Sequence, residues 1–389
     1  MAAAPPLAGW SRSAPLVSFL TGRSDLGDLA SRTGPADRLT MNRHTKTAIV
    51  ALAVFAAMVL IVMLAPVGFV AWSPGQTVDL LGESDSGPVV EVDGAQTYPA
   101  SGAILLTTVS QTRADASLRF PQAIMAYLSA AHDVFLRSDV YPTGVDATQA
   151  TASDLALMDE AKTQAAVAAL REAGLTVREA PRVTRVRVSG PSNGILQPGD
   201  IILAVDNVPV ASVDDAIDRV RQKSVGDVVV VSFERDGRIE SPVTIQTVPS
   251  SNDGRVATIG VTLASEFFFS PQVTYRIDPA IGGNSAGLAL ALAIYDRLTE
   301  PDLTGGLQVA ATGAIDARGR VAAIGGVNEK VAAALAQGAE VFLLPATNCA
   351  DLTAPPDGIR LVPVTSLSTA ITVMEILTRP GSGTPLPSC

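Results

Sequence analysis

The sequence predicts an α+β multidomain chain with a single transmembrane helix, a small β-rich module and an α/β domain. Three observations predict this organisation. Residues 48–72 contain no charged residue, residues 177–250 form short strand-like segments around one helix, and residues 255–377 alternate between strands and helices. With 389 residues and 47% hydrophobic composition, the chain is long and apolar enough to bury more than one core.

The uncharged run AIVALAVFAAMVLIVMLAPVGFVAW at residues 48–72 predicts one membrane span, because about 20 apolar residues cross the hydrocarbon layer. Residues 1–46 hold six basic and three acidic residues, whereas the whole chain carries a net charge of −10. Since positive flanks tend to stay in the cytoplasm, we expect a single-pass protein of the cell membrane. Residues 1–46 would be a disordered cytoplasmic tail, with the rest of the chain outside the cytoplasm. A cleaved signal peptide is the alternative, although its apolar core usually has only about 7 to 15 residues. Met41 is an alternative start.

Residues 73–175 are expected to form a strand and helix region beyond the membrane. Alternating segments such as AILLTTV predict strands, and helices are expected at 120–137 and 153–173. Ser153 or Asp154 is suited to cap the second of these helices, and a glycine follows its last residue.

Residues 378–389 are expected to form a C-terminal tail. It contains Cys389, and the only other cysteine is Cys349. A disulfide between them could persist outside the cytoplasm, but the sequence does not give their separation in space, so the pairing stays open.

The segment 177–250 has an order of elements that resembles a PDZ domain of the kind attached to bacterial proteases. The strand-like VTRVRVSG is followed by a Gly-Asp turn, IILAVDNVPV, the short helix SVDDAIDRVRQ and two further strands. The resemblance implies capture of an extended peptide or a C-terminus as an added strand beside the helix. The alternative is a β-module that only packs against its neighbour.

Composition and motifs exclude several classes of function. The acidic balance argues against a nucleic-acid partner, and the sequence lacks the G-x-x-x-x-G-K-[ST] phosphate loop, so we expect no ATP. The only histidines are His44, on the expected cytoplasmic side, and His132. No metal site built on two histidines is therefore expected outside, no cofactor is expected, and a Ser-His-Asp triad would have to use His132.

Ser285 lies where the glycine-rich turn Ile-Gly-Gly-Asn-Ser-Ala-Gly enters the apolar helix expected at 285–298. Glycine allows a close approach of the substrate, and the free N–H groups at a helix start can bind a developing oxyanion. This is a suitable place for a nucleophile. The alternative is that Ser285 only caps the helix.

Lys330 lies on the helix expected at 327–337, after the second double glycine. Lysine is scarce in this chain, with four residues among 28 Lys and Arg. Burial in an apolar site lowers the pKa of a lysine, and its neutral amine can then accept a proton from a serine hydroxyl, which an arginine cannot do. The alternative is a surface lysine on an amphipathic helix.

Taken together, these motifs resemble the proteolytic domain of the Lon family over about the last 120 residues. The matching segments are Gly283-Asn284-Ser285-Ala286-Gly287, Thr312-Gly313, Gly319-Arg320-Val321, Ile324-Gly325-Gly326 and Lys330. With the anchor and the PDZ-like module, the chain resembles the actinobacterial membrane-anchored, PDZ-containing Lon-like proteases. One departure is Asn284, where the family usually has proline.

This resemblance implies a serine endopeptidase in which Ser285 attacks and Lys330 acts as general base and then acid. It implies that Thr312 helps to hold the lysine through its hydroxyl, and that N–H groups around Gly283, Asn284 and Ala286 bind the oxyanion. Unfolded or flexible polypeptides would be cut without ATP, and the chains could form a homo-oligomeric ring. The competing hypothesis is a catalytically inactive membrane-bound PDZ scaffold.

Overall fold

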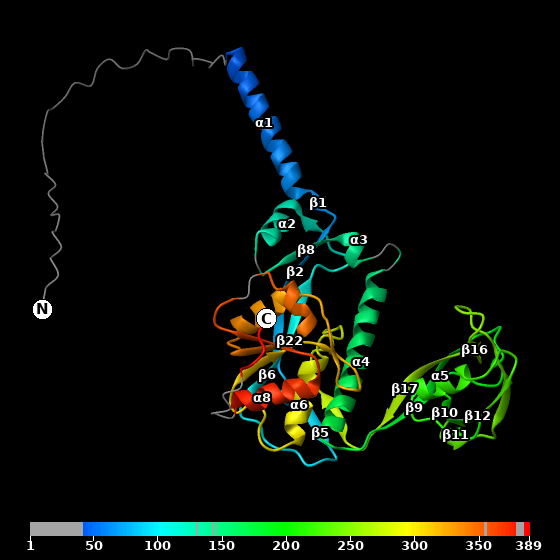
Figure 1. Ribbon diagram of the computed structural model, residues 1–389. Coiled ribbons are helices and arrows are strands. Elements are labelled where there is room, and N and C mark those ends of the chain that lie inside the picture. Colours follow the sequence, from blue (N-terminus) through cyan, green and yellow to red (C-terminus); the bar gives the residue numbers. More distant parts are fainter. Residues whose placement is uncertain (1–41, 130, 142–143, 145, 354–355, 379–384) are drawn as a thin grey trace, which may run out of the picture. The chain divides into compact units, whose positions relative to one another are not determined.

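The computed structural model describes residues 42–129, 131–141, 144, 146–353, 356–378 and 385–389. Most of the expected tail at 1–46 therefore lies outside the described residues, as does part of the tail at 378–389. The chain divides into two compact units, residues 1–60 and residues 61–389. The helices, drawn in Figure 1, are α1 Arg43–Leu64, α2 Phe120–Tyr127, α3 Arg137–Val140, α4 Ala147–Glu172, α5 Val213–Arg221, α6 Gly287–Leu298, α7 Val327–Ala336, the 3₁₀ helix η1 Ala346–Asp351 and α8 Leu367–Thr378.

Helix α1 is long and apolar enough to cross a membrane, by length and composition alone. It ends at Leu64, so the predicted span of 48–72 extends too far. Pro66 lacks the N–H that the helix would need, and the segment after it becomes extended. Strand β1 (Pro66–Val67) pairs with β7 (Leu118–Arg119), and the long strand β2 (Phe69–Asp79) follows.

A six-stranded sheet forms the larger part of the second unit, in the order β23-β22-β19-β6-β2-β8. The first four strands are parallel, and β2 and β8 continue the sheet antiparallel. Strand β22, VFLLP, is buried along its whole length, as expected for a parallel strand covered on both faces. The bounds are β6 Ala103–Gln111, β8 Asp133–Leu136, β19 Gln308–Ala311, β22 Val341–Pro345 and β23 Arg360–Val364.

Helices cover both faces of this sheet because alternate residues of each strand point to opposite sides. On one face, Leu106 and Leu343 join a core cluster with residues of α4, α6 and α8. On the other face, Leu105 and Phe342 pack with Val331 and other residues of α7. The sheet thus forms the middle layer between α6 and α7.

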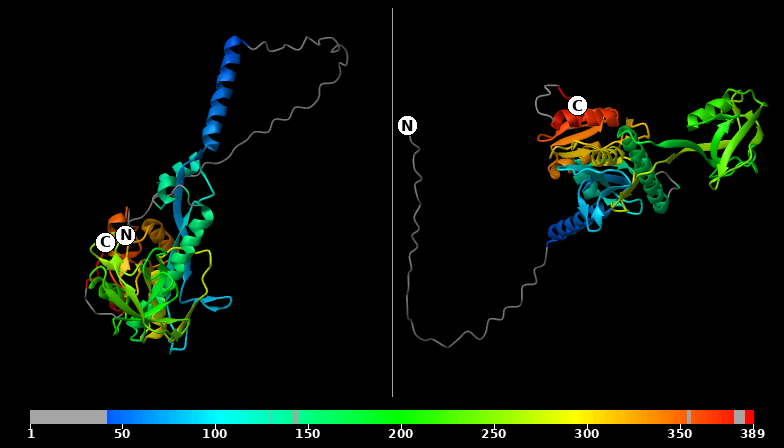
Figure 2. Two further views of the ribbon diagram at one scale, coloured as in Figure 1. Left: turned by 90° about the vertical axis from the view of Figure 1, so that its right-hand side faces the viewer. Right: turned by 90° about the horizontal axis from the view of Figure 1, so that it is seen from below.

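A second sheet makes up the PDZ-like module, in the order β13-β12-β10-β9-β17, with β11 and β14 attached. These strands surround the single helix α5, and the module is coloured green in Figure 2. The bounds are β9 Arg178–Val186, β10 Ile201–Val205, β11 Val208–Pro209, β12 Val228–Arg235, β13 Arg238–Ile239, β14 Val243–Gln246 and β17 Val261–Phe268. The remaining pairs are β3 Glu83–Ser84 with β4 Gly87–Pro88, β5 Val90–Asp93 with β18 Gln272–Tyr275, β15 Val248–Pro249 with β16 Ala257–Thr258, and β20 Ala314–Ile315 with β21 Val321–Ala322.

The six-stranded sheet takes strands from both sides of the 177–250 segment. Strands β2, β6 and β8 precede this segment, and β19, β22 and β23 follow it. The predicted division into regions 73–175 and 255–377 therefore separates strands that share one sheet. In sequence, the PDZ-like module lies between the two parts of this sheet.

Two helix predictions differ from the structure. The helix expected at 120–137 ends at Tyr127, and Asp133–Leu136 instead forms the edge strand β8 beside β2. The helix expected at 153–173 begins earlier, at Ala147, because Asp146 caps it by accepting a hydrogen bond from the Gln149 N–H at 2.7 Å.

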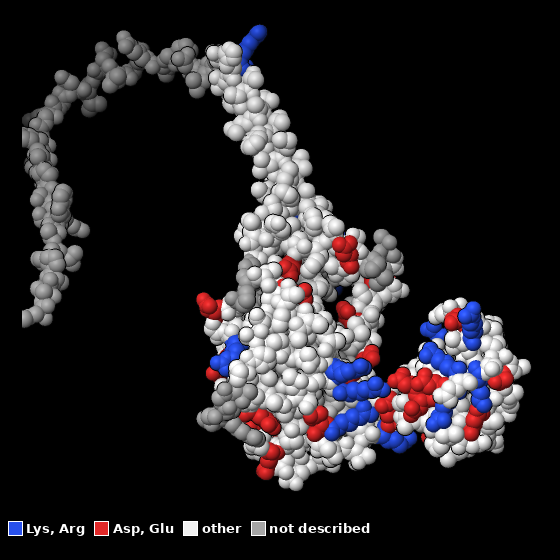
Figure 3. Space-filling model, in the orientation of Figure 1, with Lys and Arg blue, Asp and Glu red and all other residues white. Residues whose placement is uncertain are grey.

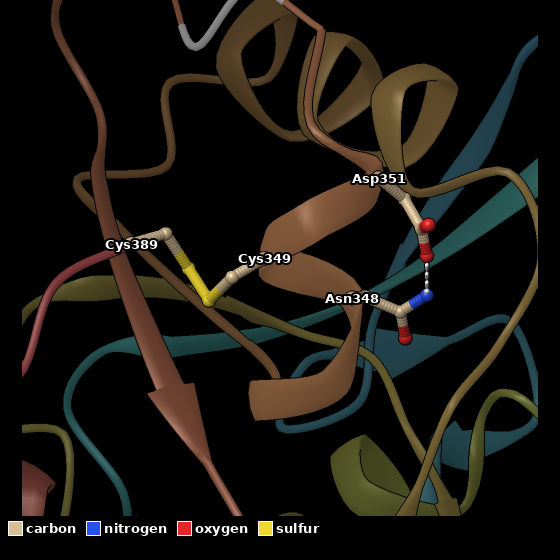
Figure 4. Close-up of a disulfide and its surroundings, with 4 residues drawn as sticks. All are labelled: Asn348, Cys349, Asp351 and Cys389. Carbon is tan, nitrogen blue, oxygen red and sulfur yellow. Dashed lines mark hydrogen bonds between the residues drawn. A yellow bond between two sulfur atoms is a disulfide. The ribbon is translucent and has the colours of Figure 1, made fainter.

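The two cysteines form a disulfide that ties the C-terminus to η1. Cys349 and Cys389 have Cα atoms 5.2 Å apart (Figure 4). Beside the bridge, the Asn348 amide donates to the Asp351 carboxylate at 2.7 Å and to the Ile324 carbonyl at 2.9 Å.

Candidate active site

The turn before α6 holds Ser285 between two other elements. On one side the Gly283 N–H donates to the carbonyl of Asp154 on α4 at 2.8 Å. On the other side the Ser285 carbonyl accepts from the Gly313 N–H at 2.9 Å and from the Thr312 hydroxyl at 3.1 Å. Gly283 has φ of 87°, a left-handed conformation that favours glycine. The turn is thereby fixed to α4 and to the loop after β19.

Ser285 does not cap helix α6. The cap position is occupied by Ala286, and no side chain makes the capping hydrogen bond. The Ser285 hydroxyl instead lies 2.9 Å from the Nζ atom of Lys330, within hydrogen-bond distance. The capping alternative is therefore wrong, and the serine side chain is directed at the amine.

Lys330 projects from α7 into the interior. Lys330 is only 3% exposed, so the alternative of a surface lysine is wrong. Besides the contact with Ser285, Nζ donates to the Thr107 carbonyl of β6 at 2.8 Å. Burial lowers the pKa of Lys330 from 10.5 to about 8, and the charge of Glu329 opposes this shift. At mildly basic pH, a large share of the amine is neutral.

Glu329 is a buried carboxyl beside this lysine in sequence. It is fully buried, and neither carboxyl oxygen has a hydrogen-bond partner among the described residues. Burial raises the pKa of Glu329, and the nearby charge of Asp133 raises it further. Sequence reasoning missed this residue, although an acidic residue within the apolar helix VNEKVAAALA was a visible signal.

The backbone of the turn offers donors for an oxyanion. The Gly283 N–H was expected among the oxyanion donors, but it already donates to the Asp154 carbonyl. Within the part of the chain that the structure describes, the N–H groups of Asn284, Ser285 and Ala286 have no acceptor. Asn284 contributes a carbonyl that accepts from the Gly287 N–H at 3.3 Å. The free donors thus lie beside the serine hydroxyl rather than at the glycine.

Thr312 and His132 do not make the contacts that the roles considered for them would need. The Thr312 hydroxyl donates to the Ser285 carbonyl rather than to the lysine amine, so it positions the serine turn. The His132 Nδ1 atom lies 2.7 Å from the hydroxyl of Ser129, so its hydrogen-bond partner is a different serine. Among the described residues, no group of three or more His, Cys, Asp or Glu side chains is arranged to hold a metal ion.

A buried lysine amine at hydrogen-bond distance from a serine hydroxyl, at the start of an apolar helix, defines a candidate Ser/Lys hydrolase site. Comparison with known families agrees with this class. Residues 279–378 match the Lon protease (S16) C-terminal proteolytic domain, and residues 158–245 match the PDZ domain. The chain therefore contains a proteolytic domain of the Lon family, a serine peptidase class, together with a PDZ domain.

Individual relatives match the region around the site. The Lon protease of Neorickettsia sennetsu is 35% identical over 115 residues, which are 28% of this chain and 14% of that protein. The Lon protease of Clostridioides difficile is 42% identical over 78 residues, or 20% of this chain and 10% of the relative. The archaeal Lon protease of Methanocaldococcus jannaschii is 40% identical over 87 residues, or 22% of this chain and 13% of the relative. The match thus spans only a small part of these relatives, and the actinobacterial part of the resemblance stays a prediction.

Among solved structures, the PDZ domain of an SdrC-like protein from Listeria monocytogenes is 26% identical to this chain. It matches 22% of this chain and 86% of that domain, with a TM-score of 0.20.

Proposed function

We propose that this protein is an ATP-independent serine endopeptidase with a Ser285/Lys330 dyad, which cuts unfolded or flexible polypeptides outside the cytoplasm. The observation that carries the proposal is the 2.9 Å distance between the Lys330 amine and the Ser285 hydroxyl in a buried site. Ser285 and Lys330 are catalytic residues in this account, and Thr312 is a positioning residue.

The reaction follows from this geometry. The neutral Lys330 amine takes the proton of the Ser285 hydroxyl as the oxygen attacks the scissile carbonyl carbon. The N–H groups of Ser285 and Ala286 bind the negative oxygen that forms, since neither has another acceptor among the described residues. The protonated amine then gives its proton to the leaving nitrogen, and the peptide bond breaks to leave an acyl-enzyme. Water attacks the ester with Lys330 again as base, which restores Ser285.

Several features support the place and the partners of this activity. The sequence has no phosphate-loop motif, so no ATP-driven unfolding is expected and flexible substrates are favoured. Helix α1 is a candidate span, and the disulfide between Cys349 and Cys389 fits an oxidising compartment outside the cytoplasm. Assembly into a ring is proposed only on the resemblance to the Lon family.

The PDZ module has a groove that suits an extended peptide. A cavity of about 280 Å³ is lined by Ala216, Ile217 and Val220 of α5 and by Val261 and Leu263 of β17. Strand β17 is the last strand of its sheet, so its outer edge can pair with an added strand. We propose that this groove captures substrate polypeptides.

Cleavage of a denatured protein by the purified full-length chain tests the proposal. Ser285→Ala removes the nucleophile, and Lys330→Arg replaces the base with a group that does not lose its proton. We expect both variants to lose cleavage by at least about a thousandfold. Ser368 is exposed, and Lys162 is a half-buried lysine that pairs with Asp159 rather than with a serine. Ser368→Ala and Lys162→Arg therefore give matched controls and should cut at the wild-type rate.

The competing function is a PDZ scaffold without catalysis. It predicts binding of polypeptides by wild type and Ser285→Ala alike, with no cleavage by either. Wild-type cleavage rates in both Ser285→Ala and Lys330→Arg would instead show that another site is responsible.

A further inference from the structure

Helix α2 exposes a stripe of apolar side chains. Phe120, Ile124, Tyr127 and Leu128 recur at the spacing of one helical face, and Met125 lies beside them. Met125, Tyr127 and Leu128 are 70%, 78% and 73% exposed, whereas only Ala123 of this helix is buried. A helix of a water-soluble domain usually buries its apolar stripe, so this face lacks a partner within the described chain.

This stripe begins where the candidate span ends. The Phe120 N–H donates to the carbonyl of Ala65, the residue after α1, at 3.2 Å. Strand β1, which follows Ala65, pairs with β7 directly before α2. The start of α2 is therefore held against the residues that directly follow α1. Figure 1 shows α2 beside β1.

The chemistry of α2 suits the boundary between lipid headgroups and acyl chains. The sequence FPQAIMAY contains no charged residue, and its segment is white in the space-filling view of Figure 3. An aromatic residue stands at each end, Phe120 and Tyr127, and such residues are enriched at membrane interfaces. The exposed Phe69 and Leu136 are paired across β2 and β8 in the adjoining edge of the sheet and extend the apolar surface.

We propose that α2 lies in the interfacial layer of the bilayer and forms a membrane contact of this domain in addition to the transmembrane helix. An amphipathic helix that lies in the interface buries its apolar face among the headgroups and acyl chains. The proposal rests on the membrane anchoring in the proposed function, but not on peptide cleavage. A second copy of the chain is the other occupant that this face could have, and the experiment distinguishes the two.

Electron paramagnetic resonance on the full-length chain in lipid nanodiscs tests this contact. The two native cysteines are joined in the disulfide, so Met125→Cys introduces a single free thiol for a nitroxide label. Leu128→Cys gives an independent label on the same face. Val188→Cys, at an exposed position of the PDZ module, is the aqueous control, and Val54→Cys within α1 is the control for the anchor.

We expect the labels at 125 and 128 to be several-fold more accessible to oxygen, and less accessible to a water-soluble nickel complex, than the label at 188. Equal accessibility at 125, 128 and 188 would overturn the proposal. Dipolar broadening between labels at 125, with little access to either reagent, would also overturn it and assign the face to a second copy. If the label at 54 is also accessible to the water-soluble nickel complex, the proposed membrane anchoring by α1 is wrong. Cleavage of a denatured protein in the same nanodiscs tests the peptidase proposal separately.

Discussion

In the described part of the chain, the Lys330 amine has two oxygen partners, the carbonyl of Thr107 and the hydroxyl of Ser285. Neither partner is a carboxylate, so neither contact stabilises the charged amine as strongly as an ion pair would. Its neighbours Val327 and Val331 on α7 are buried and apolar. This combination explains why the pKa of Lys330 is lowered to about 8 by burial.

Replacing Glu329 should change the pH at which the amine becomes neutral. The charge of Glu329 raises the pKa of Lys330 and partly opposes the effect of burial. Because catalysis needs the neutral amine, activity should rise with pH through the pKa of Lys330. In Glu329→Gln the pKa of Lys330 falls further, so the rising limb of the kcat/KM profile should move to lower pH.

The exposed carboxyl of Asp357 gives the control for this variant, and Asp357→Asn should leave the profile unchanged. A Glu329→Gln profile that coincides with the wild type, or moves to higher pH, would contradict the electrostatic role of Glu329.

The Thr312 hydroxyl should act on the position of Ser285 rather than on substrate binding. In Thr312→Val the Ser285 carbonyl loses one donor but keeps the Gly313 N–H at 2.9 Å. One neutral hydrogen bond contributes about 1 kcal/mol, so we expect kcat to fall by about fivefold with KM unchanged. Thr312→Ser keeps the hydroxyl and should therefore retain most of the wild-type kcat. Steady-state kinetics of the two variants measure this difference. Wild-type kcat in Thr312→Val would show that the contact has no positioning role.

At this scale, the sequence predicts the residues of the site better than their contacts. Ser285 and Lys330 stand out through the glycine-rich turn, the scarcity of lysine and the family pattern. The Thr107 partner is a backbone carbonyl on a distant strand, which no residue type can reveal. The Thr312 hydroxyl binds the Ser285 carbonyl because tertiary packing places the turn before α6 against the loop after β19, and this packing leaves no local signal in the sequence either.

At the scale of elements, the disulfide fastens η1 to the C-terminal end of the chain. The bridge closes a segment with a sequence separation of 40 residues. A loop of this length restricts the unfolded chain by up to about 4 kcal/mol. The double variant Cys349→Ser/Cys389→Ser should therefore melt several degrees lower while keeping its activity at low temperature, because Ser285 and Lys330 are held by α6 and α7.

Thermal melting followed by circular dichroism measures this effect. A reductant should lower the melting temperature of the wild type and leave the double variant unchanged. Equal melting temperatures of the two oxidised proteins would contradict a stabilising role of the bridge.

The groove beside α5 should affect long substrates more than short ones. Ile217→Glu places a charge among the apolar residues of the groove, so we expect KM for a denatured protein to rise several-fold. Cleavage of a short fluorogenic peptide should be unchanged, because such a peptide does not need the PDZ module. Ile239→Glu, at an exposed position of β13, is the matched control. An unchanged KM for the denatured protein in Ile217→Glu would rule out capture through this groove.

Elements with a clear period were predicted with nearly correct bounds, as for α6 and α7. Their apolar residues repeat at helical spacing, and glycine or a turn stands at their ends. The error at 120–137 has a different origin. The segment after Tyr127 is too short to show a period, and its pairing with β2 decides that it becomes the strand β8.

At the scale of the whole molecule, the sheet at the site is assembled from strands far apart in sequence. Ala103–Gln111 pairs directly with Gln308–Ala311, although the PDZ module lies between them in the chain. Lys330 depends on this pairing, since its second partner is on β6 and its first is on the turn before α6. Pairing across such a distance leaves no local signal in the sequence, so this part of the architecture could not be predicted.

The pH dependence of Ser285 phosphonylation by a fluorophosphonate probe, followed by mass spectrometry of the labelled peptide, tests the central claim most directly. The rate of labelling should rise with pH to a plateau, with its midpoint near the Lys330 pKa of about 8. Labelling should become negligible at every pH in Lys330→Met. Labelling of Ser285 that does not depend on pH, or that follows the same profile in Lys330→Met, would contradict a serine activated by this lysine.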